Sequence, residues 1–230
     1  MNKKLLLFDI DGTLLSAQGV PKKVFMQILH RRFPEYAHGS SLNFSGMTDP
    51  QIAMNILKMN HSQHSDNRQL IQDLLNDFLD ELSLHITSRN PPRIYPGVIE
   101  LLETCRYRRG CFLGLVTGNM QRGAYIKLSA CGLQNYFPVG AFGSDSPDRN
   151  QLPPIATQRA EAFYGRQFKK EDIWIIGDSI YDVRCARVNN LHCLAVCTGL
   201  TEAAILKAEH PDAIVSDFRD TQKIMEILCS

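Results

Sequence analysis

Asp9 and Asp11 are the first residues of the chain whose type and spacing suit them for chemistry. They follow the apolar run at residues 5–8 and precede Gly12 and Thr13. Because alternate residues of an extended chain leave the backbone on the same side, both carboxylates are expected to point the same way. Carboxylates held that close repel each other unless a cation or a shared proton lies between them. The pair therefore indicates a cation-binding or acid–base site. Taken alone, the five residues 9–13 could also form an ordinary acidic turn.

A second apolar run, residues 113–116, ends in Thr117, Gly118 and Asn119. If this run is a strand beside the first, the Thr117 hydroxyl and the backbone N–H groups that follow can donate to phosphate oxygens at a helix N-terminus. Taken alone, the same residues are typical of an ordinary N-cap turn. Their meaning depends on the other polar strand ends of the chain.

A third apolar run, residues 173–176, ends in Gly177 and Asp178 and so repeats the pattern of the first. Asp182 lies one helical turn beyond Asp178 and is expected to face the same way. Hard oxygen ligands of this kind favour Mg²⁺ over softer metals. The two carboxylates therefore extend the candidate metal site.

An alternation of strands and helices must position these polar residues. Besides the three runs above, apolar strand segments are expected at residues 139–142, 193–196 and 213–215, with helices between them. Strands that alternate with helices of this length predict an α/β fold whose core is a three-layer, parallel sheet. Ligands bind such sheets at the carboxyl ends of the strands, where the polar residues lie.

Residues 16–92 interrupt this alternation, because apolar residues recur there at helical spacing and no strand-like run is present. A proline-containing stretch, residues 90–97, then returns the chain to the sheet. We therefore predict an α-helical cap inserted after the first strand of an α/β core. The predicted boundaries are 1–15 and 93–230 for the core and 16–92 for the cap.

Together the motifs resemble the haloacid dehalogenase-like hydrolase superfamily, in the branch of phosphoglycolate phosphatase-like and β-phosphoglucomutase-like proteins with an α-helical cap. The resemblance rests on Asp-Ile-Asp-Gly-Thr at residues 9–13, Val-Thr-Gly-Asn at 116–119 and Gly-Asp-Ser-Ile-Tyr-Asp at 177–182. It covers residues 4–15 and 95–230, while the cap matches in position and helical character alone. The family implies a Rossmann-like core and phosphoryl transfer.

The resemblance implies a Mg²⁺-dependent phosphatase that works through an aspartyl-phosphate. Asp9 would attack phosphorus, and Asp11 would protonate the leaving alcohol and later deprotonate water. Asp11 also argues against dehalogenase chemistry, which has no leaving alcohol to protonate. The implied metal ligands are Asp9, Asp11 through its backbone carbonyl, Asp178 and Asp182.

A cation in the loop after the strand expected at residues 139–142 completes the implied phosphate site, which otherwise consists of Thr117, Gly118 and Asn119. Most members of the family place a lysine there, whereas this chain has Arg149 and no lysine nearby. A guanidinium can offset the charge of a phosphoryl group and bind its oxygens with two hydrogen bonds. Lys127 and Arg122 are the alternatives, although a solvated side chain on a helix is the plainer interpretation of both.

Residues 44–49 precede a predicted cap helix, where related proteins place the residues that select the substrate; here these are Gly46, Met47 and Thr48. Many relatives carry a basic residue near position 47, so Met47 weakens any inference to a strongly acidic substrate. Two alternatives to a small-molecule phosphatase stay open. One is a sugar-phosphate mutase of the β-phosphoglucomutase type, and the other is a non-catalytic phosphate-binding protein, which would have no need of Asp11.

The composition is that of an ordinary globular protein of 230 residues with a formal net charge of +1. This charge gives no electrostatic footprint for nucleic acid or an anionic membrane surface. The seven cysteines contain no Cys-x-x-Cys pair, which favours reduced thiols in the cytoplasm over disulfides or structural zinc. The first apolar run is too short for a signal peptide or a membrane span. We expect a monomer or homodimer whose partner is a small-molecule phosphomonoester.

Overall fold

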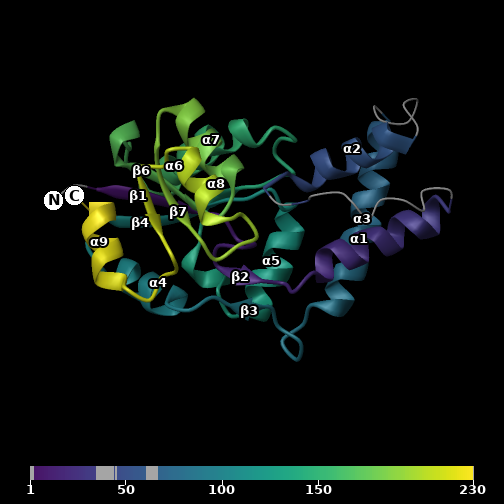
Figure 1. Cartoon of the computed structure of the whole chain (residues 1–230), viewed down its shortest axis with the longest axis horizontal. Helices are drawn as coiled ribbons and strands as arrows, with labels where there is room; N and C mark the ends of the chain where they lie inside the picture. Colours follow the sequence, from purple (N-terminus) through teal and green to yellow (C-terminus); the bar gives the residue numbers. More distant parts are fainter. Residues whose placement is uncertain (1–2, 35–43, 45, 61–66, 230) are drawn as a thin grey trace.

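The computed structural model describes residues 3–34, 44, 46–60 and 67–229, with the backbone alone at 59 and 60. Figure 1 shows an α/β core and, beside it, a group of helices formed by the segment that follows the first strand. This arrangement confirms the predicted fold class, a parallel sheet with an inserted helical region.

The core is a sheet of six strands in which every neighbouring pair is parallel. In sheet order the strands are β5 (Gly140–Ala141), β4 (Cys111–Val116), β1 (Lys4–Phe8), β6 (Ile173–Gly177), β7 (His192–Val196) and β8 (Ala213–Val215). β1 therefore lies inside the sheet, and its carboxyl end is flanked by the ends of β4 and β6. Parallel neighbours need crossover connections, which the helices provide.

Both faces of the sheet are buried, and alternate residues of a strand serve opposite faces. In β1, Leu6 and Phe8 pack on one side and Leu5 and Leu7 on the other, and all four are fully buried. This division follows from the two-residue period of a strand. A strand covered on both faces consequently appears in the sequence as a continuous apolar run.

Helices form the two outer layers of the core. The face with Leu6 and Phe8 is covered by α4 (Val98–Tyr107), α5 (Gln121–Ala130) and α9 (Thr221–Cys229). The face with Leu5 and Leu7 is covered by α6 (Leu152–Tyr164), α7 (Ile180–Asn189) and α8 (Ala203–Ala208). Short 3₁₀ turns lie at Gln134–Tyr136, Arg149–Gln151 and Lys170–Asp172. Within the described residues, no helix has the length and apolar character needed to cross a bilayer.

Three helices form the inserted cap: α1 (Val20–Arg32), α2 (Asp49–Asn60) and α3 (Arg68–His85). Their apolar faces meet in a hydrophobic core of their own, in which the rings of Phe25 and Phe78 lie 5.2 Å apart between centroids. The chain leaves and rejoins the sheet through a short antiparallel pair, β2 (Leu15–Ser16) and β3 (Arg93–Ile94). This pair lies next to the predicted domain boundaries, which stay a prediction.

The cap rests on the core where α3 meets α5. A Cβ on Gly123 of α5 would lie 3.0 Å from Cδ2 of Leu79, so the glycine lets the two helices approach closely. Next to it, Arg122 and Asp80 form an exposed ion pair of 2.6 Å. Solvent screens such a pair, which limits its contribution to about 0–1 kcal/mol. Arg122 therefore binds a cap carboxylate at the surface and lies outside the strand-end site.

Substitution of Gly97 tests the close packing at the point where the chain returns from the cap to the core. It precedes α4 with a φ of 82°, and a Cβ there would overlap the backbone of Phe218. Gly97→Ala is therefore expected to lower the free energy of unfolding by about 3 kcal/mol or more. Gly132→Ala is the matched control, because Gly132 also has a positive φ, of 72°, but a Cβ added there would have no neighbouring atom within 4 Å. That change should cost about 1 kcal/mol. Urea unfolding of both variants measures the difference, and equal losses would contradict this account.

Candidate active site

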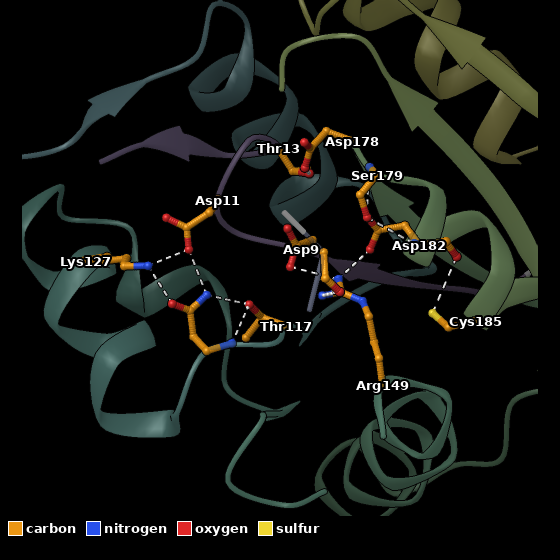
Figure 2. A network of polar contacts seen from close by, with 12 residues as sticks. Asp9, Asp11, Thr13, Thr117, Lys127, Arg149, Asp178, Ser179, Asp182 and Cys185 are labelled. Atoms are coloured by element: carbon orange, nitrogen blue, oxygen red, sulfur yellow. Dashed lines mark hydrogen bonds and ion pairs between the residues drawn. The ribbon is translucent and has the colours of Figure 1, made fainter. Parts of the chain in front are cut away.

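Three strand ends meet at one edge of the sheet and carry the polar residues that the sequence singles out. Asp9 follows β1, Thr117 follows β4 and Asp178 follows β6. Because β1 pairs with β4 on one side and with β6 on the other, the three residues become neighbours. Figure 2 shows them together with Asp182 and Arg149.

Asp9, Asp178 and Asp182 form a compact acidic cluster. One carboxylate oxygen of each lies within 4.8 Å of the others, and the residues are 6%, 3% and 0% exposed. Burial, followed by repulsion from the neighbouring carboxylates, opposes ionisation of Asp9 and Asp178. It raises the pKa of Asp9 to about 7 and that of Asp178 well above its ordinary value. The cluster is therefore short of positive charge.

Two glycines leave room for the Asp178 carboxylate. A Cβ on either Gly12 or Gly199 would overlap it. Gly12 also has a φ of 87°, which only glycine adopts without strain. The adjacent Thr13 hydroxyl donates to Asp178 Oδ1 over 3.1 Å. The segment at residues 9–13 therefore carries the carboxylates of Asp9 and Asp11 and also helps to position that of Asp178, at the end of β6.

Arg149 is the cation inside the acidic cluster. Its Nη2 donates to Asp9 Oδ1 over 3.0 Å and to Asp182 Oδ1 over 2.5 Å, and the residue is buried. Its Nη1 also donates to the Gly46 carbonyl of the cap, at 3.3 Å. The side chain comes from the 3₁₀ turn before α6. A single guanidinium still leaves three ionised carboxylates with a net negative charge.

The hydrogen bonds of Asp182 show how a metal ion would fit. Its Oδ1 accepts from Arg149, and its Oδ2 accepts from the N–H and hydroxyl of Ser179 over 3.0 and 2.6 Å. This capping box opens α7 and fixes the carboxylate. Both oxygens of Asp182 are thus engaged, which leaves Asp9 and Asp178 as the more available donors. Buried oxygen atoms with excess negative charge fit a hard divalent cation.

Asp11 lies outside the acidic cluster and has different partners. Its Oδ2 accepts from Lys127 Nζ over 2.5 Å and from Asn119 Nδ2 over 2.8 Å, while 37% of its side-chain surface stays exposed. Asn119 also donates to Thr117 Oγ1 over 2.7 Å and accepts from Lys127. Figure 2 shows Lys127, Asp11 and Thr117 on the side of Asp9 opposite to Asp182. Asp9 and Asp11 thus share no hydrogen-bond partner in the described network.

The interpretation of Lys127 as a solvated side chain is wrong. Lys127 is 2% exposed, and its ammonium group lies between Asp11 and Asn119. The reason is tertiary, since α5 packs against the sheet on one side and against α3 of the cap on the other. A lysine inside this helix therefore has little access to solvent. In the sequence, Lys127 is one residue of a predicted helix, and no local pattern indicates that it is buried.

A cavity of about 730 Å³ lies between the strand ends and the cap. Asp9 and Asp11 line its core side, and Gly46 and Met47 line its cap side, while their role in selecting the substrate stays a prediction. Thr48, the third residue of that prediction, is fully buried. Its hydroxyl donates to the Pro147 carbonyl over 2.7 Å, so it ties the cap to the core.

The start of α2 holds the cap against the strand ends. The Asp49 N–H donates to the Gly118 carbonyl over 2.8 Å, and Asp49 Oδ2 accepts from the Met120 N–H over 2.7 Å. A Cβ on Gly118 would overlap the Met47 carbonyl, so the two backbones lie in direct contact. Burial raises the pKa of Asp49 to about 6. Asp49 is a cavity residue that the sequence did not single out, and its hydrogen bonds join the cap to the core.

Comparison with known proteins supports one family. A model described as haloacid dehalogenase-like hydrolase matches residues 6–196. Pyrophosphatase PpaX of Oceanobacillus iheyensis is 26% identical over 96% of this chain and 95% of its own length. A phosphoglycolate phosphatase of Nitrosococcus oceani is 24% identical over 96% of each chain.

Solved structures support the same fold. A hydrolase from Pseudomonas syringae aligns with a TM-score of 0.71 at 20% identity and covers 99% of both chains. A predicted phosphatase from Clostridium acetobutylicum aligns with a TM-score of 0.73 at 22% identity, over 98% of this chain and 100% of the other. At these identities the likeness extends to the fold alone.

Removal of one carboxylate tests whether the acidic cluster binds a divalent cation. Saturating Mg²⁺ is expected to raise the thermal midpoint of the wild type by roughly 2–8 °C, because the ion binds the folded state only. Asp178→Asn should lose this gain. In EDTA it should be at least as stable as the wild type, because the amide relieves repulsion and can still accept from Thr13. Thermal unfolding with Mg²⁺ and with EDTA measures both effects, and an undiminished Mg²⁺ gain in Asp178→Asn would contradict the assignment.

Proposed function

The chain belongs to the haloacid dehalogenase-like hydrolases, and on that basis we propose that it is a Mg²⁺-dependent phosphatase that hydrolyses a small-molecule phosphomonoester through an aspartyl-phosphate. The observation that carries this proposal is the separation of Asp9 from Asp11. Asp9 lies in a buried acidic cluster with an arginine, whereas Asp11 lies at the cavity with a lysine. Two neighbouring carboxylates thereby have environments suited to two different tasks.

Asp9 is the proposed nucleophile. An ionised carboxylate attacks phosphorus without help from a base. Arg149, 3.0 Å from Asp9 Oδ1, favours the ionised form against the burial that raises the pKa of Asp9. Attack forms a bond between the Asp9 carboxylate and phosphorus and breaks the bond between phosphorus and the alcohol oxygen. Water later attacks the same phosphorus and releases Asp9 and inorganic phosphate.

Asp11 is the proposed acid–base group. In the first step it gives a proton to the departing alcohol oxygen, and in the second it takes one from the attacking water. Its side chain reaches the cavity, as both steps require. Lys127 and Asn119 hold its Oδ2 and leave Oδ1 without a described hydrogen bond, so Oδ1 is the oxygen proposed to carry the proton. Lys127 is thus proposed to position Asp11.

The transferring phosphoryl oxygens are proposed to bind Thr117, Arg149 and the backbone N–H groups of Gly118 and Asn119. Three of these residues follow β4 directly and precede α5, so their N–H groups lie near a helix N-terminus that favours anions. Thr117, Gly118, Asn119 and Arg149 all line the cavity. Donors fixed by the fold before the substrate arrives stabilise the charge that develops on these oxygens.

Mg²⁺ is proposed to bind Asp9, Asp178 and the backbone carbonyl of Asp11, with Asp182 behind them. When bound, the ion supplies positive charge that offsets the carboxylates and the phosphate dianion. The buried oxygen donors and their shortage of positive charge support this choice. Arg149 alone leaves the cluster undercompensated, even before a phosphate enters.

The cavity argues against a sugar-phosphate mutase. A mutase that works through a bisphosphorylated sugar must hold a second phosphate far from Asp9. Among the described cap residues that line the cavity, Lys22 is the only cation, and it is exposed. One exposed lysine is a weak partner for a phosphate dianion, which binds best to several fixed donors. A purely binding role, in turn, leaves the Asp11–Lys127 pair without a purpose.

Phosphate release from a panel of phosphomonoesters tests the proposed reaction. The panel contains 2-phosphoglycolate, sugar phosphates, nucleoside monophosphates and p-nitrophenyl phosphate. Asp9→Asn is expected to lower turnover at least about 10³-fold, because the nucleophile is lost. EDTA should abolish it and Mg²⁺ should restore it, while Asp73→Asn on α3 of the cap serves as a control with wild-type turnover. Conversion of a sugar phosphate into an isomer without net phosphate release would favour the mutase instead.

Lys127→Met tests the positioning of Asp11. Its kcat/KM for an alkyl phosphate is expected to fall by about 10²-fold, with most of the loss in kcat, because the proton donor is no longer held in place. The loss for p-nitrophenyl phosphate should be smaller, since p-nitrophenolate leaves without a proton. Lys127→Arg should recover part of the loss, and Arg122→Met, exposed on the same helix, should lose nothing. Equal losses for both esters would contradict the role.

A further inference from the structure

We infer that the alcohol released by this enzyme is uncharged and apolar and contains a ring, as an aromatic or alicyclic alcohol does. The inference rests on the proposed phosphatase function and names the part of the substrate that the cap contacts. It concerns the region of the cavity farther from the acidic cluster, where the leaving group must lie once the phosphoryl group is bound at Asp9.

The cap side of the cavity is largely apolar. Among the described cap residues that line it, five present large hydrophobic side chains: Phe25, Phe44, Met47, Ile52 and Phe78. They come from α1, α2, α3 and the chain before α2, so four separate segments converge on one surface. The ring of Phe25 lies 5.2 Å from that of Phe78 and 6.0 Å from that of Phe44, between centroids. An aromatic wall of this kind favours a flat or cyclic apolar group.

The size of the cavity supports a bulky leaving group. Its volume of about 730 Å³ is in the range of pockets that enclose whole drug-sized ligands. A two-carbon leaving group such as glycolate would fill a small part of that space and make few contacts with the aromatic wall. A ring-containing alcohol would instead bury its own apolar surface against the wall, in which Phe25 and Phe78 are already 4% and 3% exposed.

The charges around the cavity disfavour an acidic leaving group. The buried cations that line it in the described structure are Arg149 and Lys127, and each already faces a carboxylate. Lys22 lies at the surface, with its Nζ 5.4 Å from the centroid of the Phe44 ring. Asp49 adds negative charge on the cap side. A substrate carboxylate would therefore meet repulsion inside the cavity and only an exposed lysine to offset it.

The core side extends the apolar surface outward. Leu200, in the loop after β7, lines the cavity although 91% of it is exposed. A single exposed leucine is ordinary on a protein surface, but this one adds apolar surface to the lining of the cavity. Tyr95, at the return from the cap, adds a partly buried ring. A substrate that covers these residues would shield them from water.

Ethyl phosphate, benzyl phosphate and 2-phosphoglycolate test the inference in the presence of Mg²⁺. Ethanol and benzyl alcohol are similarly poor leaving groups, so a difference in kcat/KM reports on contacts with the cap and not on leaving ability. Benzyl phosphate is expected to exceed ethyl phosphate by about 10- to 100-fold, because it buries a phenyl ring. 2-Phosphoglycolate should not exceed ethyl phosphate.

Phe44→Ala locates the effect in the cap. The ratio of kcat/KM for benzyl over ethyl phosphate should fall by about tenfold, because one ring of the wall is removed. Phe163→Ala is the matched control, since Phe163 is an exposed phenylalanine on α6 that does not line the cavity. A general loss of folding in Phe44→Ala would lower kcat/KM for both esters equally and would not change their ratio. An unchanged ratio would therefore contradict the assignment of Phe44 to the leaving-group site.

Binding of benzylphosphonate and ethylphosphonate, measured by calorimetry with Mg²⁺, separates the two proposals. These probes have no ester bond, so their affinities do not depend on turnover, and benzylphosphonate is expected to bind about tenfold more tightly or better. Hydrolysis of ethyl phosphate at least as efficiently as benzyl phosphate, with equal phosphonate affinities, overturns the apolar leaving group and leaves the phosphatase standing. Tight binding of benzylphosphonate without hydrolysis of any ester overturns the phosphatase and supports the apolar subsite.

Discussion

The shortage of positive charge around Asp9 is the constraint on which the rest of the site depends. Asp9, Asp178 and Asp182 are buried within a few ångströms of one another, and Arg149 is the one cation among them in the described network. Burial makes each uncompensated charge costly, so the ionised cluster is favourable only when a further cation joins it. The cluster therefore offers oxygen donors that fit a hard divalent cation, which supports the proposed metal site and the proposed nucleophile beside it.

The fold satisfies this constraint through several local features. Parallel pairing of β1 with β4 and β6 brings three polar strand ends together. Gly12 and Gly199 leave space for the Asp178 carboxylate, and the Ser179 capping box holds that of Asp182. Asp11 lies outside the cluster because its carboxylate binds Lys127 and Asn119, on the side of Asp9 opposite to Asp182 (Figure 2). Two aspartates separated by one residue consequently acquire different environments, which is the physical basis for giving them different roles.

Much of the fold and part of the site followed from the sequence. Strands covered on both faces, such as β1 and β6, are continuous apolar runs, and their polar ends mark the catalytic edge of a parallel sheet. The burial of Lys127 did not follow, because it depends on α3 of the cap packing on α5. The aromatic wall was equally hidden, since Phe25 and Phe78 lie in helical patterns whose apolar faces indicate a cap core. Only the tertiary structure shows that these rings also face the cavity.

Identification of the phosphorylated residue shows whether Asp9 is the nucleophile. In Asp11→Asn, hydrolysis of the phosphorylated enzyme is expected to slow more than phosphoryl transfer from p-nitrophenyl phosphate to the enzyme. The variant is mixed with Mg²⁺ and this phosphomonoester, labelled with ³²P in its phosphoryl group. Acid quenching followed by peptide mapping should then place the label on the peptide that contains residue 9, in an acyl phosphate that hydroxylamine removes. No label is expected in the Asp9→Asn, Asp11→Asn double variant, because it lacks the proposed nucleophile. Label on another residue, or label that survives the loss of Asp9, would contradict it.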